Sequence, residues 1–389
     1  MIKSLVKKTW EFRVLVFFSL AMALLLLNNI VSTLALFILV FFLMVNKSFH
    51  FTKSKLPWFT IIFFSYVLAR ELCAMGIQNN ISEIIRLLPI LIVPFSILDY
   101  SFNEKETVYI PRIIILVNFI LYLIALFFGF LIFLDFHTSN NPLVFNLSHY
   151  QWLIPIKMGF HPPFWGLYIV LSTLFISVND NVTLEIKKLF ICVSFVFLIF
   201  LASRTALIIF IISHIIVLLR SYRKRINLKQ ILTLLVLTVC SAFLVKSSDY
   251  LTSKIYNKHG FSDRKLLWET GVDLLVENPI FGVSFSKYES SMEKKFALKN
   301  VSRQNYDPHN LFIYFGGSIG LIGLLLFLFI FLFDTKYKLN SIYLVFIVVF
   351  ILSISTETIF NRQMGVAIYS IYLGLFKKRY LYKKQGLTQ

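Results

Sequence analysis

Residues 110–134 read IPRIIILVNFILYLIALFFGFLIFL, an apolar run with a single charged residue, Arg112. A membrane-spanning helix needs roughly 20 apolar residues, so this run is long enough to cross a bilayer. Of the 389 residues, 58% are hydrophobic, 17% are aromatic and 15% are charged, whereas a soluble globular chain is typically about 45–50% apolar and about 25% charged. Together with a mean hydropathy of +0.78, this composition excludes a soluble enzyme, a disordered protein and a secreted disulfide scaffold.

Apolar runs recur along the whole chain, and each is a candidate membrane span: 14–27, 30–45, 57–76, 83–99, 110–134, 162–178, 188–202, 205–219, 230–245, 310–333, 340–356 and 363–376. Twelve such helices would use about 240 residues, which is close to the apolar content of the chain. The sequence therefore predicts an all-α, polytopic transmembrane helical bundle of about 12 spans. The first two runs are separated only by Asn28-Asn29 and fit either one long helix or two short ones.

The formal net charge is +19, from 38 Lys and Arg against 19 Asp and Glu. The basic residues fall in short clusters between apolar runs, as in the cytoplasmic loops of membrane proteins, so no nucleic-acid binding is expected. With both termini inside, 23 of the 38 lie inside, ten lie in the outside stretch 246–309, and five lie in short outside loops or at outer helix ends: Arg70, Arg86, Lys157, Arg204 and Arg362. A loop as long as 246–309 is largely exempt from the charge rule.

This topology divides the chain into three parts. Residues 1–245 hold spans 1–9, residues 246–309 form a large outside loop with short helices, and residues 310–389 hold spans 10–12 and a basic cytoplasmic tail. We expect the first apolar run to be an uncleaved helix, because it continues past the small residues around Ala23. The three cysteines are widely spaced and show no metal-binding or disulfide pattern.

Ser203-Arg204-Thr205 separates two apolar runs, which places Arg204 at or just inside the outer membrane boundary. A charged side chain costs on the order of 2.5–3.5 kcal/mol if it reaches the middle of the bilayer. Two interpretations are open. Arg204 either extends to the lipid head groups or faces a cavity as part of an anion-binding site.

The large loop contains a segment that predicts a helix, with Ser262 or Asp263 capping its start and Pro279 following its end. Arg264 and Lys265 then fall in the first turn, where the helix dipole disfavours cations by roughly 0.3–1 kcal/mol each. A bound anion reverses this effect, because free N–H groups and two cations together form a phosphate-binding site. The alternative is a solvated helix end.

Asp307-Pro308-His309-Asn310 precedes the apolar run 310–333. Pro308 suits the first helical position and Asp307 the cap, so His309 is expected at the outer end of a span. The positive end of the helix should keep His309 neutral, and a neutral imidazole is what a general base requires. The alternative is an interfacial histidine that makes one hydrogen bond.

Other charged residues lie near the outer ends of predicted spans. Arg70-Glu71 and Arg86 either pair with each other as a structural feature or help to bind a diphosphate, and Glu357 and Arg362 allow the same two interpretations. The glycine-rich run 316–323 is not a nucleotide-binding loop, because no strand precedes it. Its small residues instead have the spacing of helix packing inside a span.

Three features occur in order: Ser203-Arg204-Thr205 opening a span, a helical loop from Arg264 to Pro279 that runs into Phe281-Gly282-Val283, and His309-Asn310 entering a glycine-rich span. Together they resemble the O-antigen ligase/polymerase family, which are bacterial membrane glycosyltransferases that handle undecaprenyl-diphosphate-linked glycans. The resemblance covers about residues 190–330.

The resemblance implies an all-helical, GT-C-like enzyme with a helical periplasmic subdomain. It would lie in the bacterial cytoplasmic (inner) membrane, with both termini in the cytoplasm and the active site in the periplasm. No cofactor, metal or nucleotide sugar is implied. By resemblance, His309 matches the essential histidine of the large loop and would deprotonate an acceptor hydroxyl, while Arg204 and Arg264 engage the donor diphosphate. Direct displacement at the anomeric carbon would invert its stereochemistry.

The expected function is glycan transfer in the assembly of surface polysaccharide (O-antigen, capsule or exopolysaccharide), as a polymerase or as a ligase. The expected partners are an undecaprenyl-diphosphate-linked donor, a glycan or lipid A core acceptor, membrane lipid and other envelope polysaccharide assembly proteins. The sequence does not identify the acceptor. Further candidates for substrate binding are Arg70, Arg86, Lys265, Trp268 and Asn310.

Two other functions are open. A transporter or flippase for lipid-linked glycans would place its charged residues near the middle of the membrane, in broken helices related by repeats, whereas the candidate residues here cluster at one outer face. A structural partner in an envelope assembly complex predicts that the His309→Ala substitution leaves the glycan products unchanged.

Overall fold

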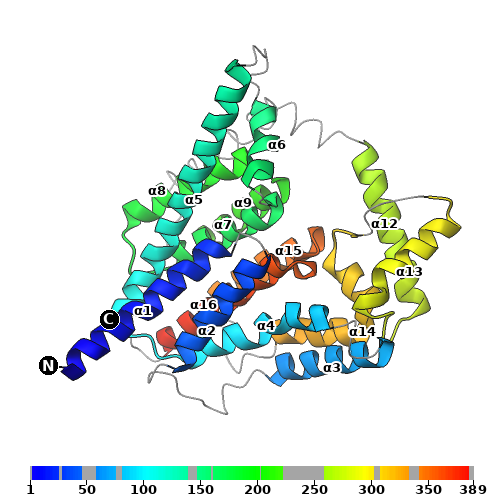
Figure 1. Cartoon of the computed structure of the whole chain (residues 1–389), viewed down its shortest axis with the longest axis horizontal. Coiled ribbons are helices and arrows are strands. Elements are labelled where there is room, and N and C mark those ends of the chain that lie inside the picture. Colours follow the sequence, from blue (N-terminus) through cyan, green and yellow to red (C-terminus); the bar gives the residue numbers. More distant parts are fainter. Residues whose placement is uncertain are drawn as a thin grey trace. The chain divides into compact units, whose positions relative to one another are not determined.

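The computed structural model describes residues 2–25, 29–45, 58–75, 81–138, 147–158, 161–201, 203–221, 258–301, 307–332 and 341–384. Within these residues the chain is all-helical and has no β-strand (Figure 1), which confirms the predicted all-α class. Each predicted apolar run coincides with a helix, except 230–245, which lies outside the described residues.

Two of the described helices are long and apolar enough to cross a membrane, namely Glu104–Asp135 and Leu311–Ile330. Several other apolar helices are shorter. The number of spans, their sidedness and the division of the chain that follows from them stay predictions.

The chain forms two compact units. Unit 1 comprises residues 1–48, 101–257 and 341–349, and unit 2 comprises residues 49–100, 258–340 and 350–389. The described helices of unit 1 are α1 (Ile2–Leu24), α2 (Asn29–Val45), α5 (Glu104–Thr138), α6 (Leu147–Met158), α7 (Pro162–Ser177), α8 (Leu184–Phe200), α9 (Arg204–Ser221) and the first part of α15 (Ser341–Thr356).

Unit 1 is built around α7, which is buried along its length from Phe164 to Ile176 and packs against α5, α8 and α9. The apolar runs on either side of Asn28-Asn29 form two helices, α1 and α2, which pack against each other. Asn118 and Ser172 form a buried polar pair within the unit, in which the Asn118 side-chain amide donates to the Ser172 hydroxyl at 3.1 Å. Such pairing is required wherever water is excluded.

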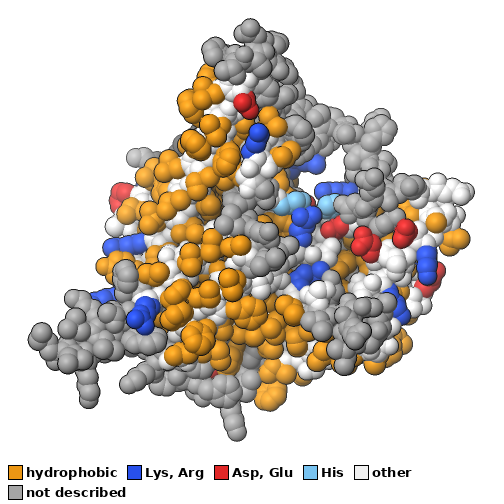
Figure 2. Space-filling model, in the orientation of Figure 1, with side chains coloured by type: hydrophobic (Ala, Val, Ile, Leu, Met, Phe, Trp, Pro, Cys, Tyr) orange, Lys and Arg blue, Asp and Glu red, His pale blue; other side chains and the backbone are white. Residues whose placement is uncertain are grey.

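The surface of α5 is strongly apolar. Five of its large side chains are 54–64% exposed: Leu116, Leu123, Leu126, Phe127 and Phe130. Figure 2 shows hydrophobic side chains over much of the visible face of the molecule. Exposed apolar surface of this extent marks contact with lipid or with another protein, and it agrees with the membrane location that the composition predicts.

Unit 2 contains α3 (Trp58–Met75), α4 (Ile81–Asp99), α12 (Lys258–Glu277), α13 (Phe285–Leu298), α14 (Leu311–Leu332), the rest of α15, the short 3₁₀ helix η3 (Ile359–Asn361) and α16 (Gln363–Lys384). Aromatic rings fill its core, with the ring centroids of Phe315 and Phe327 4.8 Å apart. At the end of α4, the Lys378 ammonium donates to the Leu98 carbonyl at 2.7 Å. A basic side chain there satisfies a carbonyl that the helix leaves free.

The large loop is mainly helical where it is described, because α12 and α13 occupy most of residues 258–298. The connection between these helices lies against α14 at Gly320, where α14 is broken (φ 68°, ψ −177°). Backbone hydrogen bonds join the two segments: Val283 N–H donates to Gly317 O at 2.9 Å, and Leu321 N–H donates to Pro279 O at 2.8 Å. The break in α14 therefore fixes the position of the chain that leads from α12 to α13.

The glycine-rich run serves two purposes, of which the sequence predicted one. Gly316 packs against Leu275 of α12, and Gly317 against Tyr288 of α13, as helix-packing residues do. Gly320 instead forms the break. A Cβ atom at Gly320 would lie 2.2 Å from the Ile280 carbonyl oxygen, and its positive φ favours glycine.

A candidate active site around His309

His309 lies in a turn that precedes α14. The helix begins at Leu311, and its cap is Asn310, whose Oδ1 accepts hydrogen bonds from the N–H groups of Phe312 at 3.0 Å and Ile313 at 3.3 Å. The prediction that Asp307 caps this helix is therefore wrong. An asparagine side chain one residue before the helix satisfies the free N–H groups. The Asp307 carboxylate is therefore available for hydrogen bonds within the turn.

Asp307 holds the backbone of His309. Its Oδ1 accepts a hydrogen bond from His309 N–H at 2.8 Å, and its carboxylate also accepts the Thr358 hydroxyl, at 2.6 Å for Oδ2. His309 has φ 49°, a left-handed conformation that costs a residue with a side chain on the order of 1 kcal/mol or more. The two bonds to Asp307 stabilise the turn in that conformation.

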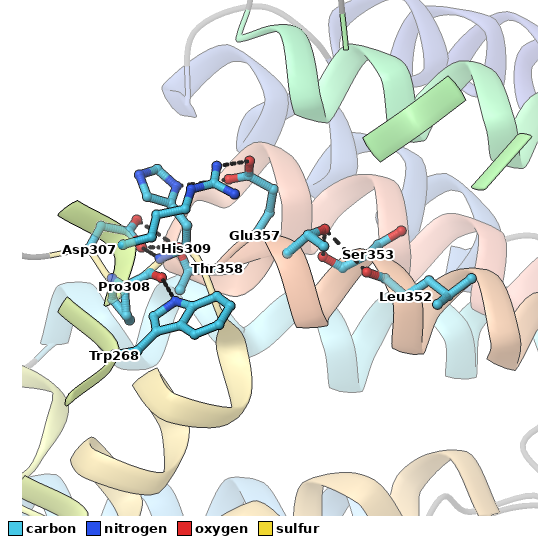
Figure 3. Close-up of polar contacts among 10 residues, drawn as sticks. Trp268, Asp307, Pro308, His309, Leu352, Ser353, Glu357 and Thr358 are labelled. Carbon is cyan, nitrogen blue, oxygen red and sulfur yellow. Dashed lines mark hydrogen bonds and ion pairs between the residues drawn. The ribbon is translucent and has the colours of Figure 1, made fainter. Parts of the chain in front are cut away.

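Trp268 supports the same turn from α12. Its indole N–H donates to the Pro308 carbonyl at 2.7 Å (Figure 3). Trp268 was predicted to bind substrate, and the structure places its polar group on the backbone beside His309 instead. The turn is thus held by α12 on one side and by Thr358 on the other.

The imidazole of His309 faces the carboxylate of Glu357, which follows α15 (Figure 3). The Nδ1 atom of His309 lies 3.1 Å from Oε2 of Glu357. Because a carboxylate accepts hydrogen bonds, this pairing favours the tautomer that carries its proton on Nδ1. The Nε2 atom is then free to accept a proton from another group. The His309 side chain is 29% exposed, so a substrate can reach it.

The pKa of His309 is raised above the ordinary value of 6.5, chiefly by the hydrogen bond to Glu357. Burial and Arg264 lower it, and the charges of Glu357 and Asp307 raise it further. The helix end was predicted to favour the neutral form of His309, whereas the hydrogen bond to Glu357 acts in the opposite direction and raises the pKa. This pairing stabilises the fold below about pH 6.5, and the contribution is lost as the pH rises through the folded-state pKa.

Arg264 lies beside this pair. Its Nη2 atom is 3.9 Å from Oε1 of Glu357, and its side chain is 38% exposed. α12 begins at Lys258, so Arg264 and Lys265 lie about two turns after the start of the helix. The prediction that these two residues lie in the first turn of the helix is therefore wrong. Arg264 points to Glu357 instead, while Lys265 is exposed and pairs with Glu269 at 3.7 Å.

Arg70 and Glu71 bind the connection between α12 and α13 rather than each other. The Arg70 guanidinium donates to the Phe281 carbonyl at 2.9 Å and to the Gly282 carbonyl at 2.6 Å. Glu71 accepts the N–H of Phe285 at 2.7 Å, at the start of α13, where a carboxylate is favoured by the helix dipole. Both residues therefore fix the loop that follows α12.

Two other arginines were predicted as site residues, Arg86 and Arg204. The Arg86 Nη1 atom donates to the Asn361 carbonyl at 3.3 Å, which ties α4 to η3. Arg204 is the first residue of α9 in unit 1. This agrees with the prediction that Arg204 begins a helix. Unit 2 thus brings together His309, Arg264 and Glu357, and Arg204 belongs to the other unit.

Sequence reasoning did not predict that Glu357 or Thr358 contacts the turn at His309. The sequence showed only that Glu357 is a charged residue at a predicted outside turn. Thr358 gave none, because its partner Asp307 is 51 residues away in the chain. Both residues follow α15, and only the folded chain brings them to the turn before α14.

Chemically, the arrangement is an imidazole oriented by a carboxylate, with a guanidinium beside it. Such an imidazole can take a proton at Nε2 while the carboxylate stabilises the resulting positive charge. The adjacent guanidinium is suited to the oxygens of a phosphate group. The site is therefore able to combine proton removal with the binding of an anionic leaving group.

Residues 189–328, about a third of the chain, match the protein family described as O-antigen ligase. This match confirms the resemblance predicted from the sequence. It includes Arg204, Arg264 and His309, whereas Arg70, Glu71 and Glu357 lie outside it. No curated protein matches the chain.

Proposed function

We propose that this chain is a membrane glycosyltransferase of surface polysaccharide assembly, which transfers a glycan from an undecaprenyl-diphosphate donor to a sugar hydroxyl. The similarity of residues 189–328 to O-antigen ligases supports the reaction class. The observation that carries the proposal is the carboxylate-oriented His309, which lies beside Arg264 within that similar region. The proposed location is the bacterial inner membrane, with both termini cytoplasmic and the site periplasmic.

In the proposed reaction, the acceptor hydroxyl gives its proton to Nε2 of His309. The acceptor oxygen forms a bond to the anomeric carbon of the donor glycan. The bond from that carbon to the diphosphate oxygen breaks, and its electron pair leaves with the diphosphate. A single displacement of this kind inverts the configuration at the anomeric carbon.

Glu357 and Arg264 have distinct roles in this scheme. Glu357 holds the Nδ1 proton of His309 and stabilises the imidazolium that forms. Arg264 has one ion pair among the described residues, long at 3.9 Å, so its N–H groups can bind diphosphate oxygens. Positive charge aimed at a leaving group stabilises the transition state more than the ground state. We propose that Arg204 adds to this charge and that no metal ion is required.

The remaining candidates for substrate binding are Arg70, Arg86, Lys265, Trp268 and Asn310. Lys265 is exposed on the same helix as Arg264 and is placed to meet a charged substrate from solvent. In the other four, polar groups bind backbone atoms of unit 2. We propose that these four act chiefly by holding the site in shape.

The test is complementation of a strain that lacks its own copy of this chain, with surface glycan read on a gel. The His309→Ala variant should lose polymer or ligated product, since a general base contributes roughly 10²–10⁴-fold to a rate. The matched control is Lys294→Ala, an exposed site on α13. Normal glycan from a well-expressed His309→Ala variant would refute the proposed base.

The null strain also separates a polymerase from a ligase. If the chain is a polymerase, its loss leaves single repeat units on the surface lipid. If it is a ligase, its loss leaves long glycans on the carrier lipid. The two products differ in length and in the lipid that holds them, so one gel and one lipid extraction distinguish them.

A further inference from the structure

The connection between α12 and α13 is attached to α14 by backbone hydrogen bonds on both sides of the break at Gly320. Two N–H groups of the connection donate to carbonyls of α14 before its break, with Ser284 N–H 2.7 Å from Ser318 O. Two N–H groups of α14 after the break donate to carbonyls of the connection, at Pro279 and Ile280. Residues 278–284, here called the docked loop, are thus joined to the interior of α14 and not to its end.

The depth of this attachment follows from the length of α14. Its two parts comprise 22 residues and have a combined helical length of about 33 Å at a rise of roughly 1.5 Å per residue, which is close to the roughly 30 Å of a bilayer core. The part after Gly320 extends only about 18 Å by the same measure and cannot cross alone. If α14 crosses the membrane, the break at Gly320 and the docked loop bonded to it lie within the hydrocarbon region.

Two large side chains of the docked loop have the apolar exposure that is expected at such a depth. Ile280 and Phe281 are 55% and 54% exposed, although both are large apolar residues. On α14 beside them, Leu321, Ile322 and Leu325 are also exposed. The exposed apolar surface therefore continues from the loop onto a helix that is long and apolar enough to cross a membrane.

Where the docked loop is not bonded to α14, side chains of α3 form hydrogen bonds with its backbone. Arg70 donates to the carbonyls of Phe281 and Gly282 in the loop, and Glu71 accepts the N–H of Phe285, the residue that follows the loop. Irregular backbone is tolerated at membrane depth only where protein groups satisfy its N–H and C=O groups. Arg70 and Glu71 of α3 supply these hydrogen bonds here.

A cavity of about 680 Å³ lies between the loop and α3, lined by Tyr66, Ala69, Arg70, Cys73 and residues 278–282. We propose that the docked loop is a re-entrant segment at hydrocarbon depth, and that acyl chains of membrane phospholipid contact Ile280 and Phe281 and fill this cavity. The inference depends on α14 crossing the membrane and is independent of the catalytic role of His309.

The test uses the full chain in nanodiscs made with phospholipid alone, which excludes the lipid-linked donor as a source of hydrocarbon. One variant keeps only Cys73, which is exposed and lines the cavity, and has Cys192 and Cys240 replaced by serine. Two others replace all three native cysteines and carry Ile280→Cys or Phe281→Cys. Each thiol receives a small fluorophore, which is quenched with bromolipid in one sample and with aqueous iodide in another.

Quenching by bromolipid and protection from iodide are expected at positions 73, 280 and 281. The water-facing control is Ser290→Cys on α13, an exposed position, where iodide should quench. The lipid-facing control is Leu325→Cys on α14, where bromolipid should quench. Iodide quenching at 280 and 281, or quenching there by neither reagent, would overturn the proposal, and so would loss of bromolipid quenching at 325.

Discussion

The Nδ1 atom of His309 and the Oε2 atom of Glu357 lie 3.1 Å apart, although 48 residues separate them in the chain. The contact joins the turn before α14 to the turn after α15. It gives His309 a defined tautomer and a raised pKa. If His309 is the base, its active form is neutral, so activity must rise as the pH increases through that pKa.

The Glu357→Gln substitution removes the main cause of the raised pKa. The pKa of His309 should then fall, so the midpoint of the pH–rate profile should move to lower pH. The maximum rate should also fall, by less than the roughly 10²–10⁴-fold that a general base contributes. The measurement is the rate of glycan transfer by purified protein between about pH 5 and 9. An unmoved midpoint would remove Glu357 from the proposed mechanism.

The Arg264→Met substitution should move the same midpoint in the opposite direction. Arg264 lowers the pKa of His309 through its charge, so its removal raises that pKa and shifts the profile to higher pH. Arg264→Lys keeps the charge and should leave the midpoint in place, although the rate falls because an ammonium lacks the planar, bidentate geometry of a guanidinium. Equal profiles for both variants would contradict this role of the charge.

The Thr358→Val substitution tests whether the turn at His309 must be held. It removes the hydroxyl that donates to Asp307, while the charge of Glu357 remains. We expect about a tenfold lower kcat, or about 1.4 kcal/mol in the activation barrier, with KM and the pH midpoint unchanged. Thr358→Ser keeps the hydroxyl and should restore the rate. A rise in KM alone would instead indicate a role in substrate binding.

The Gly320→Ala substitution should destabilise unit 2. Its Cβ would lie 2.2 Å from the Ile280 carbonyl oxygen, at a residue with φ 68°, and each such backbone strain costs about 1–3 kcal/mol. The matched control is Gly316→Ala, whose Cβ meets only the flexible end of Leu275 at 3.2 Å. The melting temperature of the detergent-solubilised protein should fall clearly for the first variant and little for the second. Equal melting temperatures would show that the break tolerates a side chain.

Apolar runs predicted the helices well because a helix in lipid satisfies its own backbone, so run length alone locates it. The places of Arg204 and His309 followed from the same reasoning, since each flanks such a run. Helix starts in the large loop were predicted less well. Asn310 took the cap expected of Asp307, and α12 began before Ser262, because several residues near each start are suitable caps.

The contacts that complete the site could not be read from the sequence. The raised pKa of His309 depends on Glu357, which approaches only through the packing of α15 and η3 in unit 2. Arg70 and Glu71 were noted as charged residues near the outer end of a predicted span, with a structural and a diphosphate-binding interpretation left open. Their bonds to the loop after α12 depend on a chain reversal more than 200 residues later, for which no local pattern exists.

The break at Gly320 has a mechanical consequence. A regular helix can slide along its axis or turn about it as one rod, because all its backbone bonds are internal. α14 forms backbone hydrogen bonds with residues 279–284 on both sides of its break. These bonds hold the helix to that loop both along its axis and about it. Any sliding or rotation of α14 during turnover must carry the start of α13 with it.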